Sequence, residues 1–200
     1  MRPRFVPVSL LAALVLAVAG CARVAAPGQA AAPATTAAPP TTRTATTHAR
    51  TTRPPPRGLI PADRRQPAPG LHVTAFDGRT VTLAGYRGTP VVVNFFESWC
   101  VVCRAEQDTL DEVARKFDDR VRFAGVSNYD TVSEGRKYQR HYEIPYPLAN
   151  DSSGRTWAAW RVPYQPVTVV VDRQGRIAWR FDGGLEPGQL DPVLEYVVGA

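Results

Sequence analysis

The chain has 200 residues, 44% hydrophobic and 21% charged, which suffices for one packed domain and a tail but excludes a second folded domain. The formal net charge is +6, yet from residue 70 to the end 15 basic residues are balanced by 17 acidic ones. The excess of arginine therefore belongs to the first third of the chain. Because the folded part has no basic surface of the kind that binds nucleic acid, we expect no nucleic-acid partner.

Residues 1–21 have the layout of an export signal. Arg2 and Arg4 precede an apolar run, residues 5–19, which is shorter than the roughly 20 residues of a membrane-spanning helix. The run leads into Val-Ala-Gly-Cys21, which resembles a bacterial lipoprotein signal, where the cysteine is lipidated and becomes the mature N-terminus. An uncleaved anchor and a plain secretory signal are the alternatives, and both also export the chain. We therefore expect an extracytoplasmic protein that is attached to the cell membrane through a lipid on Cys21.

The next segment, residues 22–69, has the composition of a disordered linker. It contains 13 Ala, 10 Pro and 9 Thr, with no apolar periodicity and almost nothing large to bury. A flexible chain of this length spans roughly 35 to 40 Å. The sequence therefore predicts a tether that ends at residue 69 and a single folded domain over residues 70–200.

Within residues 70–200, apolar patterns alternate between those of strands and those of helices. Asp77-Gly78 between two short apolar runs predicts a β-hairpin. Continuous β-branched and aromatic runs predict buried strands, and apolar residues at helical spacing predict amphipathic helices. The expected strands are residues 91–96, 121–126, 167–171 and 176–181, and the expected helices are residues 101–117, 131–142, 157–161 and 190–197. This order predicts an α/β fold with a central, mainly parallel sheet, helices on both faces and an N-terminal hairpin.

Two cysteines carry the chemistry once Cys21 is assigned to the lipid. Cys100 and Cys103 lie where the first buried strand gives way to a helix, and Cys-x-x-Cys in that context is typical of a thioredoxin-like redox centre. Unpaired N–H groups at a helix start stabilise a thiolate there. A purely structural disulfide is the first alternative, but it would close too short a loop to add much stability. Half a zinc site is the second, but His72 and His141 are the only histidines of the domain.

From residue 71 to residue 198 the chain resembles the TlpA/ResA-like thiol–disulfide oxidoreductases of the thioredoxin superfamily. The matching segments are residues 77–78, 83–88, 93–106, 125–127 and 166–177, in the order and spacing of that family. The resemblance implies a thioredoxin fold, a thiol–disulfide oxidoreductase activity and no cofactor. Lipoprotein forms outside the cytoplasm are common in that family, in agreement with the leader.

The resemblance also implies roles for individual residues. Cys100 would attack a partner disulfide and Cys103 would resolve the mixed disulfide. Pro166 matches the cis-proline of the family, and the backbone of Gln165 before it would help to hold the substrate chain. A trans proline that only starts the following strand is the alternative. Trp99 would pack against the site and shape the docking surface, with simple core filling as its alternative.

Glu106 matches an acidic residue that the family uses near the active site. It follows Cys103 by three residues, so both lie on nearly the same face of the predicted helix. A carboxylate in this place would take up the proton that Cys103 must lose. The alternative is an exposed carboxylate that is favourable near a helix N-terminus. Asn94 stands where ordinary thioredoxins carry a buried acid, which strengthens the case for Glu106, although it could equally be a hydrogen-bonded strand residue.

The dipeptide between the cysteines, Val101-Val102, departs from the usual family pattern because it has neither a proline nor a histidine. Two valines give the thiolate no charge and no side-chain hydrogen bond, and a thiolate that is not stabilised favours a reducing couple. We therefore expect a reductant of protein disulfides. An oxidative folding catalyst is the main alternative, and a peroxiredoxin-type peroxidase and a copper carrier that uses His141 are weaker ones.

The expected partners follow from this chemistry and location. They are exported proteins with cysteine pairs, with apocytochrome c as one destination that the family suggests, and a membrane thiol carrier that delivers electrons. The lipid membrane is the third partner, through Cys21. We expect a monomer and no bound metal.

Overall fold

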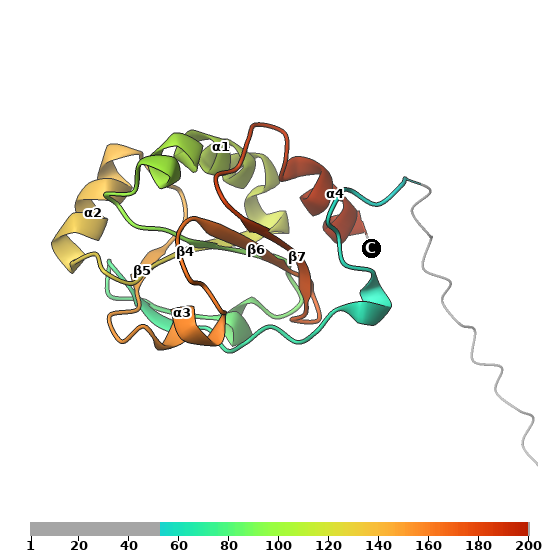
Figure 1. Cartoon of the computed structure of the whole chain (residues 1–200), viewed down its shortest axis with the longest axis horizontal. Coiled ribbons are helices and arrows are strands. Elements are labelled where there is room, and N and C mark those ends of the chain that lie inside the picture. The colour runs from blue at the N-terminus through green and yellow to red at the C-terminus, as the bar shows by residue number, and fades with distance from the viewer. Residues whose placement is uncertain (1–52, 200) are drawn as a thin grey trace, which may run out of the picture. The chain divides into compact units, whose positions relative to one another are not determined.

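The computed structural model of the chain describes residues 53–199. The predicted signal with Cys21, and the predicted linker as far as residue 52, lie outside the described residues. From residue 53 onward the chain builds one seven-stranded sheet that is covered by helices (Figure 1). The strands are β1 (His72–Ala75), β2 (Thr80–Thr82), β3 (Val91–Phe95), β4 (Arg122–Ser127), β5 (Leu148–Asn150), β6 (Val167–Val171) and β7 (Ile177–Asp182).

The strand order is β2-β1-β5-β4-β3-β6-β7, and the sheet is mixed rather than mainly parallel. Only the pairs β3–β4 and β4–β5 are parallel, whereas β1–β2, β1–β5, β3–β6 and β6–β7 are antiparallel. The expectation of a mainly parallel sheet was wrong because the connection after β5 is short. Its helix α3 (Arg155–Ala159) has five residues, about 7.5 Å of helix, which is too short to return the chain to the opposite end of the sheet. Therefore β6 starts beside the C-terminal end of β3 and runs antiparallel to it, with Val167 paired with Phe95.

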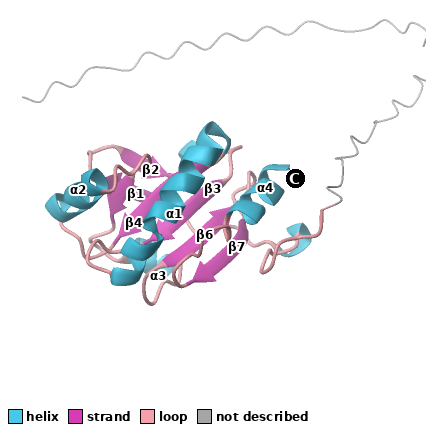
Figure 2. Cartoon of the chain, turned by 90° about the horizontal axis from the view of Figure 1, so that it is seen from above, coloured by secondary structure: helices cyan, strands magenta, loops and turns pink. Residues whose placement is uncertain are grey.

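Three longer helices pack on the face of the sheet opposite α3, and Figure 2 shows α1 lying across the strands with α4 on the same side. These helices are α1 (Val101–Phe117), α2 (Val132–His141) and α4 (Asp191–Gly199). Short 3-10 helices cover Ala62–Arg64, Leu83–Tyr86 and Asp118–Arg120. In residues 53–199, no helix combines the length and the apolar character that crossing a bilayer requires.

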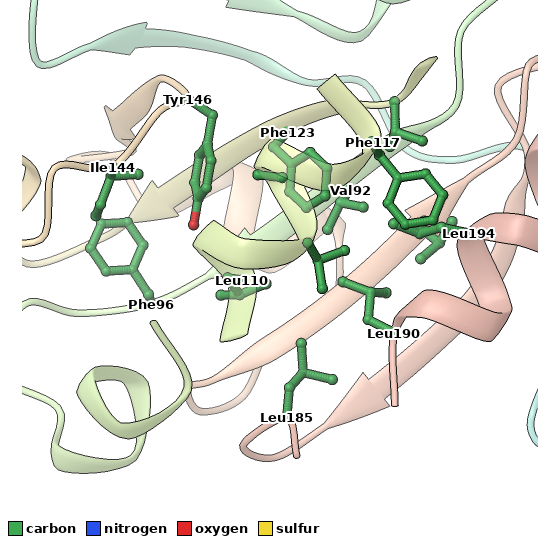
Figure 3. Packing of buried hydrophobic residues seen from close by; sticks show 14 of the residues in the cluster. Val92, Phe96, Leu110, Phe117, Phe123, Ile144, Tyr146, Leu185, Leu190 and Leu194 are labelled. Carbon is green, nitrogen blue, oxygen red and sulfur yellow. The ribbon is translucent and has the colours of Figure 1, made fainter. Parts of the chain in front are cut away.

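The strand β3 is buried on both faces, as its unbroken apolar pattern predicted. Toward α1 and α4, Val92 packs in a cluster with Leu110 and Phe117 of α1, with Leu194 of α4 and with Leu190 directly before α4 (Figure 3). Val91, Val93 and Phe95 of β3 face α3, and Phe95 meets two tryptophan rings there. Because its two faces are covered, β3 is a rigid platform, and the loop that follows it carries both cysteines.

The folded part begins before the predicted boundary at residue 70. Residues 53–69 run along β7, where the N–H of Ile60 donates to the carbonyl of Ala178 at 2.8 Å. The buried guanidinium of Arg65 forms an ion pair with the buried carboxylate of Asp172 at 3.1 Å. Composition predicted disorder here because an average over 48 residues cannot register that a few of them find partners more than one hundred residues away.

Candidate active site

The two cysteines lie at the N-terminus of α1. Cys100 is the N-cap residue, and its Sγ accepts a hydrogen bond from the backbone N–H of Cys103 at 3.2 Å. The backbone N–H of Cys100 donates to the carbonyl of Glu97 at 3.0 Å, which closes the turn between β3 and the helix. The two side chains form a disulfide with a Cα–Cα separation of 5.3 Å. The first turn of the helix therefore directs its free N–H groups and the positive end of its dipole toward Cys100.

The two sulfurs differ in accessibility. Cys100 is 8% exposed and Cys103 is 1% exposed, so both are buried, with Cys100 the closer to the surface. The two valines between them are exposed. A partner molecule therefore meets Cys100 first, as the assignment of the attacking and the resolving cysteine requires.

The Gln165–Pro166 peptide bond is cis, as predicted. Pro166 is buried and immediately precedes β6. Because β6 pairs with β3, the turn at Pro166 lies beside the end of β3, where the cysteine loop starts. The carbonyl of Pro166 accepts a hydrogen bond from the N–H of Gly183 at 2.9 Å, while Gln165 is half-buried. The sheet thus brings residues that are more than sixty positions apart in the sequence to one end of the fold.

Glu106 is a buried carboxyl group, 1% exposed, so its alternative reading as an exposed helix residue is wrong. One of its oxygens accepts a hydrogen bond from Nδ2 of Asn94 at 3.0 Å, and the other accepts one from the backbone N–H of Leu185 at 2.7 Å. Burial raises the pKa of Glu106 from 4.5 to about 7, while these two hydrogen bonds act to lower it. A carboxyl group that titrates near neutral pH is suited to exchange protons with a thiol.

Asn94 connects β3, β6 and α1 at the site. Its side chain is buried, and Nδ2 donates to Oγ1 of Thr168 at 3.0 Å as well as to Glu106. The two interpretations of this residue, a support for Glu106 and a hydrogen-bonded strand residue, therefore describe the same amide.

Trp99 is 55% exposed, which contradicts core filling as its role. It borders a groove of about 410 Å³ between α1 and α2, together with Arg104, Tyr138 and His141. His141 is exposed there. Among residues 53–199, no three His, Cys, Asp or Glu side chains come together in a way that could hold a metal ion.

Sequence reasoning missed the buried acids beside the cysteine loop, Asp130 and Glu97, of which Glu97 lies three residues before Cys100. Its carboxylate accepts hydrogen bonds from the Oγ–H of Ser127 at 2.8 Å and from the N–H of Asn128 at 2.8 Å. The signal was present in the sequence, because Glu97 is a single carboxylate directly after the buried run Phe95-Phe96. A buried carboxylate needs several donors, so its presence there indicated a neighbouring loop.

The AhpC/TSA family model matches residues 65–180, which is more than half of the chain. The chain belongs to the AhpC/TSA family. Thiol-disulfide oxidoreductase ResA of Bacillus thuringiensis subsp. konkukian is 24% identical over 131 residues, which cover 65% of this chain and 76% of ResA. The soluble secreted antigen MPT53 of Mycobacterium tuberculosis is 31% identical over 121 residues, which cover 60% of this chain and 66% of MPT53.

Solved structures show the same fold. A thiol:disulfide interchange protein of the thioredoxin family from Chlorobium tepidum superposes with a TM-score of 0.62 at 22% identity, covering 68% of this chain and 97% of that one. The predicted thioredoxin fold and the predicted relation to ResA are therefore confirmed. Because its relatives include ResA and a disulfide lies at the start of α1, this AhpC/TSA protein is a thiol–disulfide oxidoreductase.

Proposed function

We propose that this protein is a membrane-tethered, extracytoplasmic reductant of protein disulfides that works through Cys100 and Cys103. The observation that carries the proposal is the Cys100–Cys103 disulfide at the N-terminus of α1, with the buried carboxyl group of Glu106 one helical turn beyond Cys103. The first supplies the electron-pair chemistry, and the second supplies a proton acceptor inside the protein.

The reaction starts from the reduced enzyme. The Cys100 thiolate attacks one sulfur of a partner disulfide, which forms a mixed disulfide and releases the other partner sulfur as a thiolate that takes up a proton. Cys103 then loses its proton to Glu106, and its thiolate attacks Cys100. This step forms the Cys100–Cys103 disulfide and releases the second partner sulfur as a thiolate, which takes up a proton as Glu106 gives its own proton back. Two electrons pass from the enzyme to the partner, and a thiol carrier must return two electrons to the enzyme.

The reducing direction is supported by what surrounds Cys100. The residues between the cysteines are valines, which offer no charge and no hydrogen-bond donor from the side chain. Among the described residues, the backbone N–H of Cys103 and the dipole of α1 stabilise a thiolate on Cys100. A weakly stabilised thiolate makes the disulfide the preferred state and the dithiol a reductant.

Equilibration with glutathione tests the direction. We expect a reduction potential near that of thioredoxin, about −270 mV, rather than near that of the strong oxidant DsbA, about −120 mV. The fraction of oxidised enzyme is measured by mass after acid quenching and alkylation. A potential close to the DsbA value would contradict the reductant and would support the alternative, a disulfide-forming oxidase with the same residues.

Trapping tests the roles of the two cysteines and identifies partners. In Cys103→Ala the mixed disulfide on Cys100 cannot be resolved, so partners should accumulate in covalent complexes that dithiothreitol releases. We expect exported proteins with cysteine pairs, apocytochrome c among the candidates, together with the membrane thiol carrier that supplies electrons. Cys100→Ala is the matched control and should trap little. Equal trapping by both variants would contradict the assignment.

The tether is proposed from the leader, with Cys21 as the lipidated residue. The relative MPT53 is described as secreted, which supports a location outside the cytoplasm for this chain. Intact-mass analysis of the protein from membranes should show a chain that begins at a diacylated Cys21. A mature protein that retains Arg2, or an unmodified Cys21, would contradict the lipid anchor without touching the redox chemistry.

A further inference from the structure

Two loops meet at the end of the sheet where the redox disulfide lies. One leads from β3 into α1 and carries Trp99 and Cys100, and the other leads from β4 into α2 and carries Tyr129. Each loop contributes one buried carboxylate that holds the other loop. These carboxylates are Glu97 on the first loop and Asp130 on the second.

Glu97 is 0% exposed, and all its hydrogen-bond partners belong to the end of β4 and the following loop. Besides Ser127 and Asn128, the backbone N–H of Tyr129 donates to its two oxygens, at 3.1 and 3.3 Å. These donors satisfy both carboxylate oxygens and hold the loop through the backbone N–H groups of Asn128 and Tyr129 and the side chain of Ser127.

Asp130 completes the connection in the opposite direction. Its two carboxylate oxygens accept hydrogen bonds from the backbone N–H of Ser98 at 2.9 Å and from the Ser98 Oγ–H at 2.7 Å. Ser98 directly precedes Trp99, so these bonds hold the cysteine loop immediately before Trp99. The two carboxylates thus form a reciprocal clasp between the cysteine loop and the Tyr129 loop.

The clasp holds two aromatic side chains in solvent. Trp99 is 55% exposed and Tyr129 is 72% exposed, although aromatic rings are usually buried. Each is a direct chain neighbour of a residue of the clasp, and both loops start from adjacent, paired strands. A partner that brings a sulfur to Cys100 must contact the cysteine loop, and it therefore approaches the surface that carries Trp99 and Tyr129. A rigid exposed aromatic residue is a favourable anchor because it loses little conformational freedom on binding.

We infer that Tyr129 is a specificity-determining contact for polypeptide substrates with apolar side chains beside the reacting cysteine, and that Glu97 is the positioning residue that holds it in place. The inference rests on the proposed function, because it names a substrate contact of the same redox site. Disulfides that are too small to reach from Cys100 to the neighbouring loop do not use this contact.

The test compares a protein disulfide with a small one in the full-length chain. Insulin and hydroxyethyl disulfide are reduced with dithiothreitol as the electron source. For Tyr129→Ala we expect the KM for insulin to rise at least about fivefold, as for loss of an aromatic anchor, with kcat and the rate with hydroxyethyl disulfide unchanged. Tyr129→Phe keeps the ring and should retain the KM of the parent. A KM for Tyr129→Ala within twofold of the parent value would overturn the inference.

Glu97→Gln tests the positioning role, because it keeps the size of the side chain but places an amide donor against backbone N–H groups. We expect the same rise in KM for insulin and faster amide hydrogen exchange at residues 128–130. Asp111→Asn is the matched control, since Asp111 is also a buried carboxylate but accepts its hydrogen bond from Gln107 within α1. It should leave both the KM and this exchange unchanged.

The outcomes separate the inference from the proposed function. A parent enzyme that reduces neither disulfide contradicts the proposed function, while the hydrogen exchange of Glu97→Gln still reports on the clasp. Normal catalysis by Tyr129→Ala contradicts only the docking role. An equal rise in KM for Asp111→Asn and Glu97→Gln means that general destabilisation explains the effect and overturns the positioning role.

Discussion

The buried carboxyl group of Glu106 is predicted to control how the rate depends on pH. It must be ionised to accept the proton of Cys103, so kcat/KM for disulfide reduction should rise with pH to a plateau above its pKa of about 7. In Glu106→Gln this proton acceptor is missing. We expect the rate at neutral pH to fall about a hundredfold, the lower end for a lost general base. The remaining activity should instead follow the thiol, with a midpoint near a pKa of about 8.5.

The same residue makes a prediction for stability. Raising the pKa of this carboxyl group from 4.5 to about 7 corresponds to about 3 kcal/mol of free energy against its ionised form in the folded state. Between these two pKa values the folded protein binds more protons than the unfolded one, so the free energy of unfolding falls as pH rises. The full loss is reached above about pH 7, and it is absent below about pH 4.5.

Urea unfolding of the oxidised protein across this pH range measures the effect. The parent should lose about 3 kcal/mol relative to Glu106→Gln between pH 4.5 and pH 8, because other groups contribute equally to both proteins and cancel in the difference. A difference that does not change with pH, or a Glu106→Gln variant that keeps the parent pH–rate profile, would refute the reasoning.

Asn94 offers a second test of the same carboxyl group. Its side-chain hydrogen bond lowers the pKa of Glu106, so Asn94→Ala should move the midpoint of the pH–rate profile to higher pH. A purely structural role for Asn94 would lower stability and leave the midpoint in place.

The remaining predictions concern the fold. Arg65→Met should lower the free energy of unfolding by about 3 kcal/mol, measured in urea, because the buried Asp172 loses one of two arginine partners; no loss would place residues 53–69 outside the domain. Gly135→Ala should cost about 1–3 kcal/mol despite the better helix propensity of alanine, since its Cβ would lie 2.1 Å from the Phe76 ring. Gly70→Ala meets nothing within 4 Å and should be close to neutral in the same assay.

Local patterns in the sequence determined the elements and the reacting residues. The strand at Val167–Val171 and the helix at Val101–Phe117 have the predicted bounds, because each follows from the apolar spacing of its own residues. The spacing also placed Cys100 at the start of that helix and Glu106 on the face of Cys103. These are short-range properties, and a window of about one helix contains all the information that they need.

The tertiary structure decided the environment of those residues. Glu106 is buried among distant segments, and Leu185, 79 residues away, donates a hydrogen bond to it; burial raises its pKa to about 7, while this hydrogen bond acts to lower it. The direction of β6 and the packing of residues 53–69 also depend on partners far along the chain. Burial and hydrogen bonding between distant segments appear in no local periodicity, since they exist only after the chain has folded and water has been excluded. The sequence by itself therefore determined which groups can react, whereas the fold decided how acidic they are and what can approach them.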